Sequence, residues 1–295
     1  MVKFAEWDMR RELSRIWQVC FSESPRFPDY FLNNCFKPEN CLVKVSGSRV
    51  ESCVYMLPAY IASDGECFKA HYIFAAGTLP EMRGRGYMSE LLGAAADSGA
   101  RRGEKYSAVL PSEQSLYGFY KKSGYKSFFK VRTLSISRDK MEQTAVYKSG
   151  RQFKVILDSR RLNSLRRICL SPNRGSLLWS DGMFRFCTGM GKIYGEKLIS
   201  VKAGDNIAYA VCSSADNGGC LISEAMADNT NAAGLLWAAV LNDMPAENYL
   251  LRLSADSILF PGKGDISYFG MIKPLGSTDI ATLKPNRPYL GLGLD

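Results

Sequence analysis

The residues with the clearest chemical potential form a short turn in which two arginines alternate with two glycines, Arg83-Gly84-Arg85-Gly86. Glycine has no Cβ atom, so the backbone of such a turn can lie close to a bound ligand. Hydrogen bonds from guanidinium and backbone N–H groups are strongest toward phosphate oxygens. The turn therefore predicts a site for a pyrophosphate group, although taken alone it fits a basic surface turn equally well.

A strand and a helix flank this turn and would hold it in place. Residues 70–78 (AHYIFAAGT) form a continuous apolar run, which is typical of a strand covered on both faces, and Pro80 ends it. After the turn, apolar side chains recur at the spacing of one helix face, and Gly99 stands where a helix commonly ends. This apolar stripe consists of Met88, Leu91, Leu92, Ala95 and Ala96. The unpaired N–H groups at the start of a helix favour anions, which strengthens the prediction.

Two familiar phosphate motifs do not account for the turn. The sequence has no GxxxxGK[ST] motif, and the spacing is not that of GxGxxG. Residues 83–87 instead fit the pattern RxxGx and resemble the acyl-CoA pyrophosphate loop of the GNAT superfamily, the general-control-related N-acetyltransferases. The resemblance implies that the cofactor contacts Arg83, Gly84, Arg85, Gly86, Tyr87 and Met88.

Met88 departs from the pattern, because most of that superfamily has Gly or Ala there. Its backbone N–H can still donate, so we expect a tighter fit against the phosphate. A bulky residue at this position also resembles the enhanced-intracellular-survival type of acetyltransferase. That branch carries a third, sterol-carrier-like domain for which this chain has no room, so its aminoglycoside specificity is not carried over.

A second motif agrees with the resemblance. GNAT domains typically have Phe-Tyr, three residues, and then Gly with an aromatic residue, as Phe119, Tyr120, Gly124 and Tyr125 do here. A departing thiolate needs a proton, and a phenol, with an unperturbed pKa of about 10 against about 8.5 for a thiol, is a suitable donor. Its position in the motif predicts that Tyr120 is the general acid that donates this proton.

Tyr117 is the alternative acid. It follows Ser112 and Glu113 at the spacing of the SExxIY segment that holds the catalytic tyrosine in the enhanced-intracellular-survival branch. Tyr117 and Tyr120 are three residues apart and so share one helix face. Packing of both rings in the core is the alternative explanation for this pair of aromatic residues.

The resemblance also places the pantetheine arm of the cofactor between two splayed parallel strands. Ala76, Gly77 and Thr78 would pair with it through their backbone, in agreement with the rule that ligands lie beyond the carboxyl ends of parallel strands. A backbone N–H there could stabilise the oxyanion. We also expect Ser112 to contact the cofactor.

The sequence does not identify the base that deprotonates the amine. Among Glu81, Glu90 and Glu113 no carboxylate stands out, and Glu81 is expected to be a solvated loop residue. A water relay, Glu113, and the terminal carboxylate of Asp295, which serves in the enhanced-intracellular-survival branch, are the alternatives. A frayed tail would remove the last of these.

The order of elements predicts an α/β fold with mixed sheets, built from tandem GNAT-like domains over residues 1–143 and 144–295. In the first half we expect helices over 8–21, from Pro28 onward and over 115–123, and a strand over 106–110 parallel to the central strand. Residues 41–45 and 49–57 read as an antiparallel hairpin. Residues 128–137 alternate and are expected to close the first domain.

The second half repeats this order. We expect strands at 153–157, 197–202, 207–212, 220–227 and 248–253, with helices at 158–170, near 180–188 and at 229–242. Between its central strand and the next helix lie Asp228, Asn229 and Thr230, which suit a helix cap but include no arginine or glycine. This domain is therefore predicted to be degenerate, without a pyrophosphate site. The tail, residues 285–295, is apolar enough to dock.

Composition narrows the function classes. The 295 residues carry a net charge of +9. Residues 1–143 contain 21 Lys+Arg against 16 Asp+Glu and the remainder 17 against 13, so no basic arm for nucleic acid stands out. The nine cysteines show no metal spacing, and His71, the single histidine, lies in a predicted buried strand. The lack of a long apolar run, together with an acidic, amphipathic start, predicts a cytoplasmic protein.

These observations predict an acetyltransferase that takes acetyl-CoA as co-substrate, requires no metal, and acetylates a primary amine of a small molecule, peptide or protein. Two rivals remain. Aminoacyl-tRNA-dependent peptidyltransferases also pair two GNAT-like domains but generally lack the pyrophosphate loop. A non-catalytic acyl-CoA-binding module would bind the cofactor without transfer. The sequence leaves the oligomeric state open.

Overall fold

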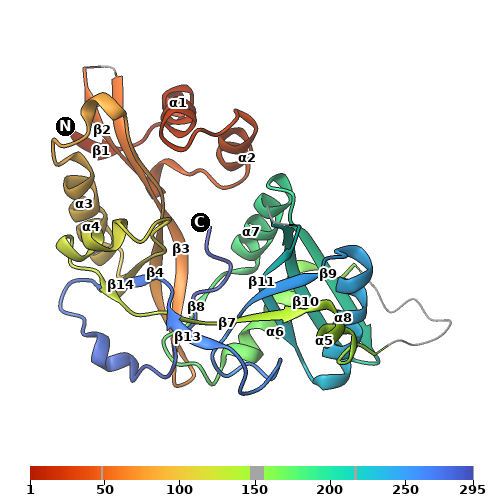
Figure 1. Ribbon diagram of the computed structural model, residues 1–295. Helices are drawn as coiled ribbons and strands as arrows, with labels where there is room; N and C mark the ends of the chain where they lie inside the picture. The colour runs from red at the N-terminus through yellow and green to blue at the C-terminus, as the bar shows by residue number, and fades with distance from the viewer. Residues whose placement is uncertain (48, 147–155, 216–217, 295) are drawn as a thin grey trace.

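The computed structural model describes residues 1–47, 49–146, 156–215 and 218–294, and its strands form two separate sheets (Figure 1). The first sheet contains β1 (Val2–Phe4), β2 (Cys41–Ser46), β3 (Arg49–Ser63), β4 (Glu66–Thr78), β5 (Tyr106–Val109), β6 (Lys126–Ser127), β8 (Leu177–Leu178) and β14 (Met271–Pro274). The second contains β7 (Lys130–Ser137), β9 (Lys197–Ala203), β10 (Asn206–Ser214), β11 (Cys220–Ala227), β12 (Asn248–Leu253) and β13 (Asp265–Tyr268). The helices are α1 (Arg10–Phe21), α2 (Arg26–Asn34), α3 (Tyr87–Arg101), α4 (Leu116–Lys122), α5 (Arg138–Glu142), α6 (Ser159–Leu170), α7 (Asp181–Ile193) and α8 (Thr230–Asp243).

Both sheets are mixed, as predicted. The first has the order β1-β2-β3-β4-β5-β14-β6, with β8 beside β3, and the second has the order β13-β7-β12-β11-β10-β9. Each contains a parallel pair joined by a helix: α3 connects β4 to β5, and α8 connects β11 to β12. The two halves thus share the strand–helix–strand unit that the sequence indicated.

The central unit of the first half agrees with the sequence prediction. β4 ends at Thr78, a 3₁₀ turn begins at Pro80, and α3 begins at Tyr87. The predicted end of α3 at Gly99 is two residues early. Gly99 lies against the side chains of His71 and Glu104, where a Cβ atom would come within 2.9 Å of each, so packing rather than helix termination requires glycine there.

The other helices of the first half begin close to their predicted positions. α1 begins at Arg10, after a 3₁₀ turn over Trp7–Met9. α2 begins at Arg26 and not at Pro28, but Pro28 still lies in the first turn, where a missing N–H costs no intrahelical hydrogen bond. α4 ends at Lys122, just before Gly124 with its left-handed φ of 88°.

The parallel pair of the first sheet opens along its length. Among the described residues, β4 pairs with β5 from Ala70 to Tyr72, although β4 continues to Thr78. A register shift in the β3–β4 pairing places Ala75 and Ala76 opposite Val54, and Ala75 has a left-handed φ of 42°. This β-bulge bends β4 at the start of the opening. The carboxyl half of β4 therefore has a backbone edge free of β5.

The closing strands were assigned to the wrong sheet. Residues 128–137 were expected to close the first domain, but β7 pairs with β12 and β13 in the second sheet. In exchange, β14 lies between β5 and β6 in the first sheet. The sheets thus exchange strands across the expected boundary at residues 143 and 144. Alternation shows that a segment is a strand, but not which strand it joins.

The second half contains most of its expected elements. α6, α7, β9, β10, β11, α8 and β12 all form. Asn229 caps α8, its side chain accepting a hydrogen bond from the N–H of Ala232, as the predicted cap required. The strand expected at 153–157 lies largely outside the described residues, and residues 156 and 157 are not in a strand.

A buried ion pair fixes the tail to the second half. The Arg166 side chain on α6 and the Glu224 side chain on β11 are both fully buried, and Arg166 Nε donates to Glu224 Oε1 at 3.0 Å. The hydroxyl of Tyr209 donates to the same oxygen at 2.6 Å. Arg166 also donates to the carbonyl of Leu290 in the tail at 2.8 Å. The tail docks, as predicted, and its last described residues lie between the two halves (Figure 1).

Candidate active site

The arginine–glycine turn has an open backbone at the start of α3. Gly84 and Gly86 adopt left-handed φ values of 76° and 77°, and Gly86 is the N-cap of α3. A Cβ atom at either position would meet nothing within 4 Å, so the outer side of the turn is accessible. Arg83 Nε donates to the carbonyl of Thr78 at 3.2 Å, which fixes the turn to the end of β4. The geometry suits the binding of a pyrophosphate.

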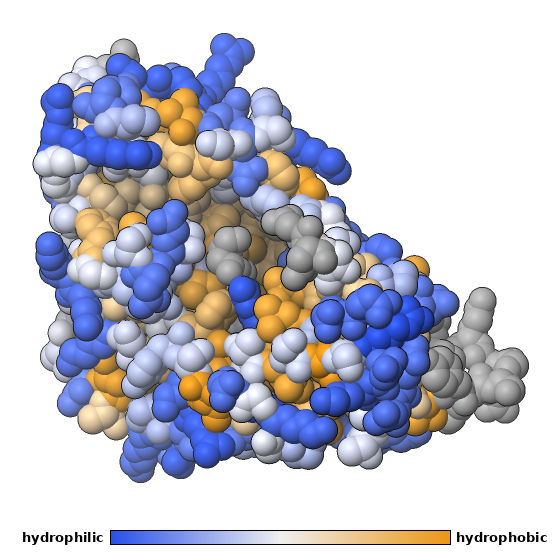
Figure 2. All heavy atoms as spheres, in the orientation of Figure 1, coloured by the Kyte–Doolittle hydropathy of each residue, from blue (hydrophilic) through white to orange (hydrophobic). Residues whose placement is uncertain are grey.

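A cavity of about 550 Å³ begins at the opening between β4 and β5 and extends between the two halves of the chain. Figure 2 shows the molecule hollowed there, with hydrophobic residues inside the hollow. Three predicted site residues line the cavity: Ala76, Ser112 and Tyr120. Gly77, Thr78, Tyr117 and the turn at 83–88 are not part of its lining. The cavity lies beside residues 73–76 of β4, and the turn follows the end of that strand, as a long ligand bound at both places would require.

The two candidate tyrosines have different surroundings. Tyr120 is 6% exposed and lines the cavity, and burial raises its pKa to about 12. Its ring packs edge-on against Phe119 and Tyr125. The hydroxyl of Tyr117 accepts a hydrogen bond from the backbone N–H of Gly270 at 3.1 Å, next to β14. The contacts therefore favour Tyr120 as the proton donor and give Tyr117 a structural partner.

The carboxylates considered from the sequence lie away from the cavity. Glu81 accepts from Arg49 at 2.6 Å, Glu90 pairs with Lys44 at 2.5 Å, and Glu113 accepts from Ser115 at 3.1 Å. None of the three lines the cavity. Asp295 lies outside the described residues, whereas Leu294 lines the cavity wall.

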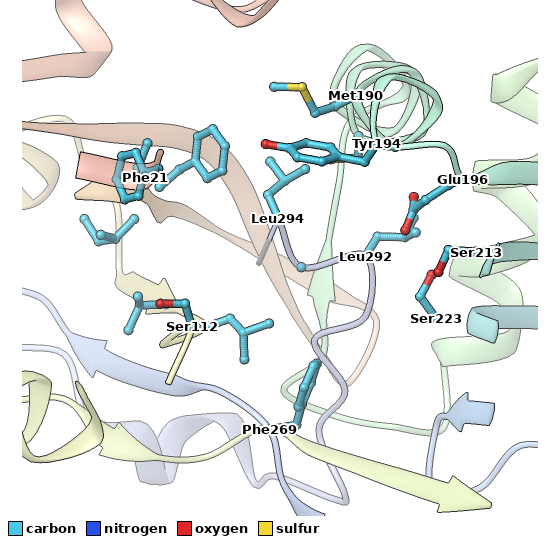
Figure 3. Close-up of a pocket in the computed structure, with 18 of the residues that line it drawn as sticks. Phe21, Ser112, Met190, Tyr194, Glu196, Ser213, Ser223, Phe269, Leu292 and Leu294 are labelled. Atoms are coloured by element: carbon cyan, nitrogen blue, oxygen red, sulfur yellow. The ribbon is translucent and has the colours of Figure 1, made fainter. Parts of the chain in front are cut away.

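Sequence reasoning missed the part of the cavity that the second half supplies. This part comprises Cys187, Met190, Gly191, Tyr194, Glu196, Ser213, Ser214, Leu221, Ser223 and Arg252. Figure 3 shows Phe21 and Ser112 on one side and Tyr194, Glu196, Ser213 and Ser223 on the other, with Leu292 and Leu294 of the tail between them. The α1 residues Trp17, Phe21 and Glu23 were missed as well.

One sequence signal could have pointed to the far wall. The segment GMGKIYG at the end of α7 has glycines at positions 189 and 191, which is unusual inside a helix. A Cβ atom at Gly189 would lie 2.2 Å from the Tyr30 hydroxyl, and one at Gly191 would lie 1.9 Å from a carboxylate oxygen of Glu196. Gly189 thus allows α7 to approach α2, and Gly191 leaves room for Glu196, which lines the cavity.

His71 has a structural environment, as expected. It is fully buried, and its Nδ1 lies 2.5 Å from Glu104 Oε2. Burial lowers the pKa of His71. Among the described residues, no group of three or more His, Cys, Asp or Glu side chains could hold a metal ion. Of the described helices, none has the length and apolar character to cross a membrane.

Comparisons with known proteins agree with this geometry. Residues 2–128 match the family model described as "Acetyltransferase (GNAT) domain". A GCN5-related N-acetyltransferase from Kribbella flavida is 18% identical with a TM-score of 0.70, over 92% of this chain and 70% of the other. A probable N-acyltransferase from Enterococcus faecalis is 15% identical with a TM-score of 0.72, over 93% and 72%. Eis1 from Mycobacterium abscessus is 13% identical with a TM-score of 0.66, over 93% and 73%.

No curated protein matches the chain by sequence. At identities of 13–18%, the likeness to the solved structures shows a shared fold that extends over both halves.

Proposed function

Because residues 2–128 belong to the GNAT acetyltransferase domain family, we propose that the chain moves an acetyl group from acetyl-CoA to a primary amine. One observation carries the proposal. The gap lies beside the carboxyl half of β4, the open turn at the start of α3 follows the end of that strand, and the Tyr120 side chain lines the cavity at the gap. This arrangement suits a ligand with a pyrophosphate at one end and a reactive thioester at the other.

We assign the binding roles accordingly. The turn residues Arg83, Gly84, Arg85, Gly86, Tyr87 and Met88 would hold the pyrophosphate. Lys44 lies over the Tyr87 ring, 5.1 Å from its centroid, and is paired with Glu90 of α3. The backbone of Ala76, Gly77 and Thr78 would pair with the pantetheine arm. Ser112 at the cavity wall would contact the same ligand.

The reaction would proceed by direct attack in a ternary complex. The amine nitrogen forms a bond to the thioester carbon, and a backbone N–H of β4 stabilises the oxyanion. The carbon–sulfur bond then breaks, and the thiolate takes the proton of Tyr120. A phenol is protonated at neutral pH at its ordinary pKa, and burial, which raises the pKa of Tyr120, keeps it so. The attacking amine loses its own proton to water or to a carboxylate of the cavity.

The second half is proposed to be a degenerate GNAT-like domain. It has the parallel pair β11 and β12 with α8 between them, but Asn229 occupies the start of that helix and no arginine–glycine turn precedes it. Its role would be to build the far wall of the cavity. The two domains would divide near residues 143 and 144, apart from the exchanged strands β7 and β14.

The proposal is tested by acetyl transfer. Free thiol released from acetyl-CoA is measured against a panel of primary amines, with product mass as confirmation. We expect intersecting initial-rate lines when both substrates are varied, because both must be bound together. Binding of acetyl-CoA without transfer to any amine would favour a non-catalytic module. Salt-sensitive tRNA binding without acetyl-CoA binding would favour a tRNA-dependent peptidyltransferase.

A substitution in the turn tests whether the turn binds the pyrophosphate. Gly86→Ala places a Cβ atom at a left-handed position on the accessible side of the turn. We expect the Kd for acetyl-CoA, measured by calorimetry, to rise about tenfold, which equals the loss of one hydrogen bond to a charged group, about 1.5 kcal/mol.

Gly93→Ala is the control for this change. Gly93 lies on the exposed face of α3 in helical conformation, and a Cβ atom there meets nothing within 4 Å. This variant should keep the wild-type Kd and gain up to about 1 kcal/mol of stability, because alanine is the better helix former. Equal Kd values for the two variants would place the pyrophosphate elsewhere.

A further inference from the structure

We propose that the acceptor of this enzyme is a primary monoamine carried on an apolar body, bound between the end of α1, the end of α7 and the tail. This inference rests on the proposed acetyl transfer and names the class of amine. Three features of the cavity carry it: its apolar wall, its few charges, and a hydrogen bond that joins the two halves at its rim.

One part of the wall beyond the gap in β4 is apolar. It is formed by Trp17, Phe21, Phe74, Met190, Phe269, Leu292 and Leu294. Trp17 and Phe74 pack edge-on, with ring centroids 5.4 Å apart, so this part of the wall is rigid. Phe21 is 40% exposed although it lies at the cavity. Such a surface gains free energy when an apolar ligand covers it.

The charges of the cavity are few. Among the described lining residues they are Glu23, Glu196 and Arg252. The Arg252 guanidinium lies over the Phe269 ring, 4.9 Å from its centroid. A polycation would place several ammonium groups in this space, and each would need a carboxylate in reach to offset its lost hydration. Two carboxylates with a guanidinium nearby suit a single ammonium group.

The hydrogen bond at the rim places one of these carboxylates. The hydroxyl of Tyr194, just after α7, donates to Glu23 Oε1 at 3.0 Å. The Tyr194 ring stacks on Phe27 of α2, with centroids 4.1 Å apart and planes 18° apart. Tyr194 is thus held by stacking and in turn orients Glu23 toward the cavity that both residues line. Glu23 would pair with the ammonium of the acceptor, which releases a proton to water before its nitrogen attacks the thioester, and Tyr194 is a positioning residue.

The remaining polar groups of the far wall are neutral. Ser213 on β10 and Ser223 on β11 face each other in Figure 3 and can accept one polar substituent of the acceptor. Their hydroxyls impose no charge requirement. The apolar part of the wall therefore favours an apolar body, and Glu23 favours one ammonium group.

The experiment compares phenethylamine and hexylamine with spermidine as acceptors for the full chain at saturating acetyl-CoA. We expect kcat/KM to be at least tenfold higher for the two monoamines. Glu23→Gln should raise KM for hexylamine about tenfold with little change in kcat or in the Kd for acetyl-CoA. Tyr194→Phe, which keeps the stacked ring, should raise KM by a few fold.

Glu12→Gln is the matched control on α1: Glu12 is partly exposed, pairs with Arg15 and is not part of the cavity lining, so this change should leave KM unchanged. A preference for spermidine, or a KM for hexylamine that Glu23→Gln does not alter, would overturn the acceptor inference alone. Absence of transfer to every amine, with acetyl-CoA still bound, would overturn the proposed function together with it.

Discussion

Replacing Tyr120 by phenylalanine is expected to lower kcat by about 10²- to 10⁴-fold, the range in which general acid catalysis contributes. The change removes one hydroxyl from a ring that is 6% exposed and packed between Phe119 and Tyr125, so the fold should be retained. KM and the Kd for acetyl-CoA should change little, because the proton is needed only when the thiolate departs. Steady-state kinetics with a good acceptor, together with calorimetry, measure these quantities.

Tyr117→Phe is the matched comparison on the same helix. It removes the hydroxyl that accepts the Gly270 N–H, so we expect a loss of about 1 kcal/mol in stability and a kcat within a few fold of wild type. The reverse result, with Tyr117→Phe inactive and Tyr120→Phe active, would assign the acid to Tyr117.

The second large effect is expected at the buried ion pair. Glu224→Ala leaves the Arg166 guanidinium buried without its carboxylate, which should cost about 3–5 kcal/mol of unfolding free energy. The tail should loosen too, because Arg166 also donates to the carbonyl of Leu290, and Gly291 lies against Glu224. Chemical unfolding measures the first effect, and a raised acceptor KM reports the second.

The double variant Arg166→Met, Glu224→Leu is the control for this prediction. It removes both charges and keeps side chains of similar volume, so much of the lost stability should return. The acceptor KM should stay raised, because the double variant lacks the Arg166 side chain that donates to the tail. A Glu224→Ala protein as stable as wild type would contradict the role assigned to the pair.

The parts of the fold that local patterns determine could be predicted from the sequence. β4, the turn and α3 follow from an apolar run, two glycines and a helical stripe within one continuous stretch. The Asn229 cap of α8 was likewise readable from three residues. Such signals depend on neighbours along the chain, and a single sequence displays them directly.

The exchange of β7 and β14 could not be predicted in this way. β14 is a four-residue strand between Gly270 and a turn, and its partners β5 and β6 lie more than 140 residues earlier in the chain. Whether β7 joins one sheet or the other depends on packing between distant segments. No local pattern carries that information.

The site was predictable to the same extent. The turn and the two tyrosines carry motif spacing, so the sequence offers them as candidates. A shared helix face leaves the choice between Tyr117 and Tyr120 open, and their contacts supply an argument for Tyr120 that the sequence does not contain. Glu23 and Tyr194 come together from positions 171 residues apart, and neither belongs to a motif. The acceptor side of the cavity therefore becomes visible only in the folded chain.

The most direct test of the central claim is the stability of the wild-type chain as acetyl-CoA is added from micromolar to millimolar concentration. Binding at the turn predicts a rising unfolding free energy, by about 2.7 kcal/mol when the ligand reaches a hundredfold its Kd. Gly86→Ala should need about ten times more ligand for the same gain. An unfolding free energy that stays constant over the whole range would contradict the assignment of the acetyl-CoA site.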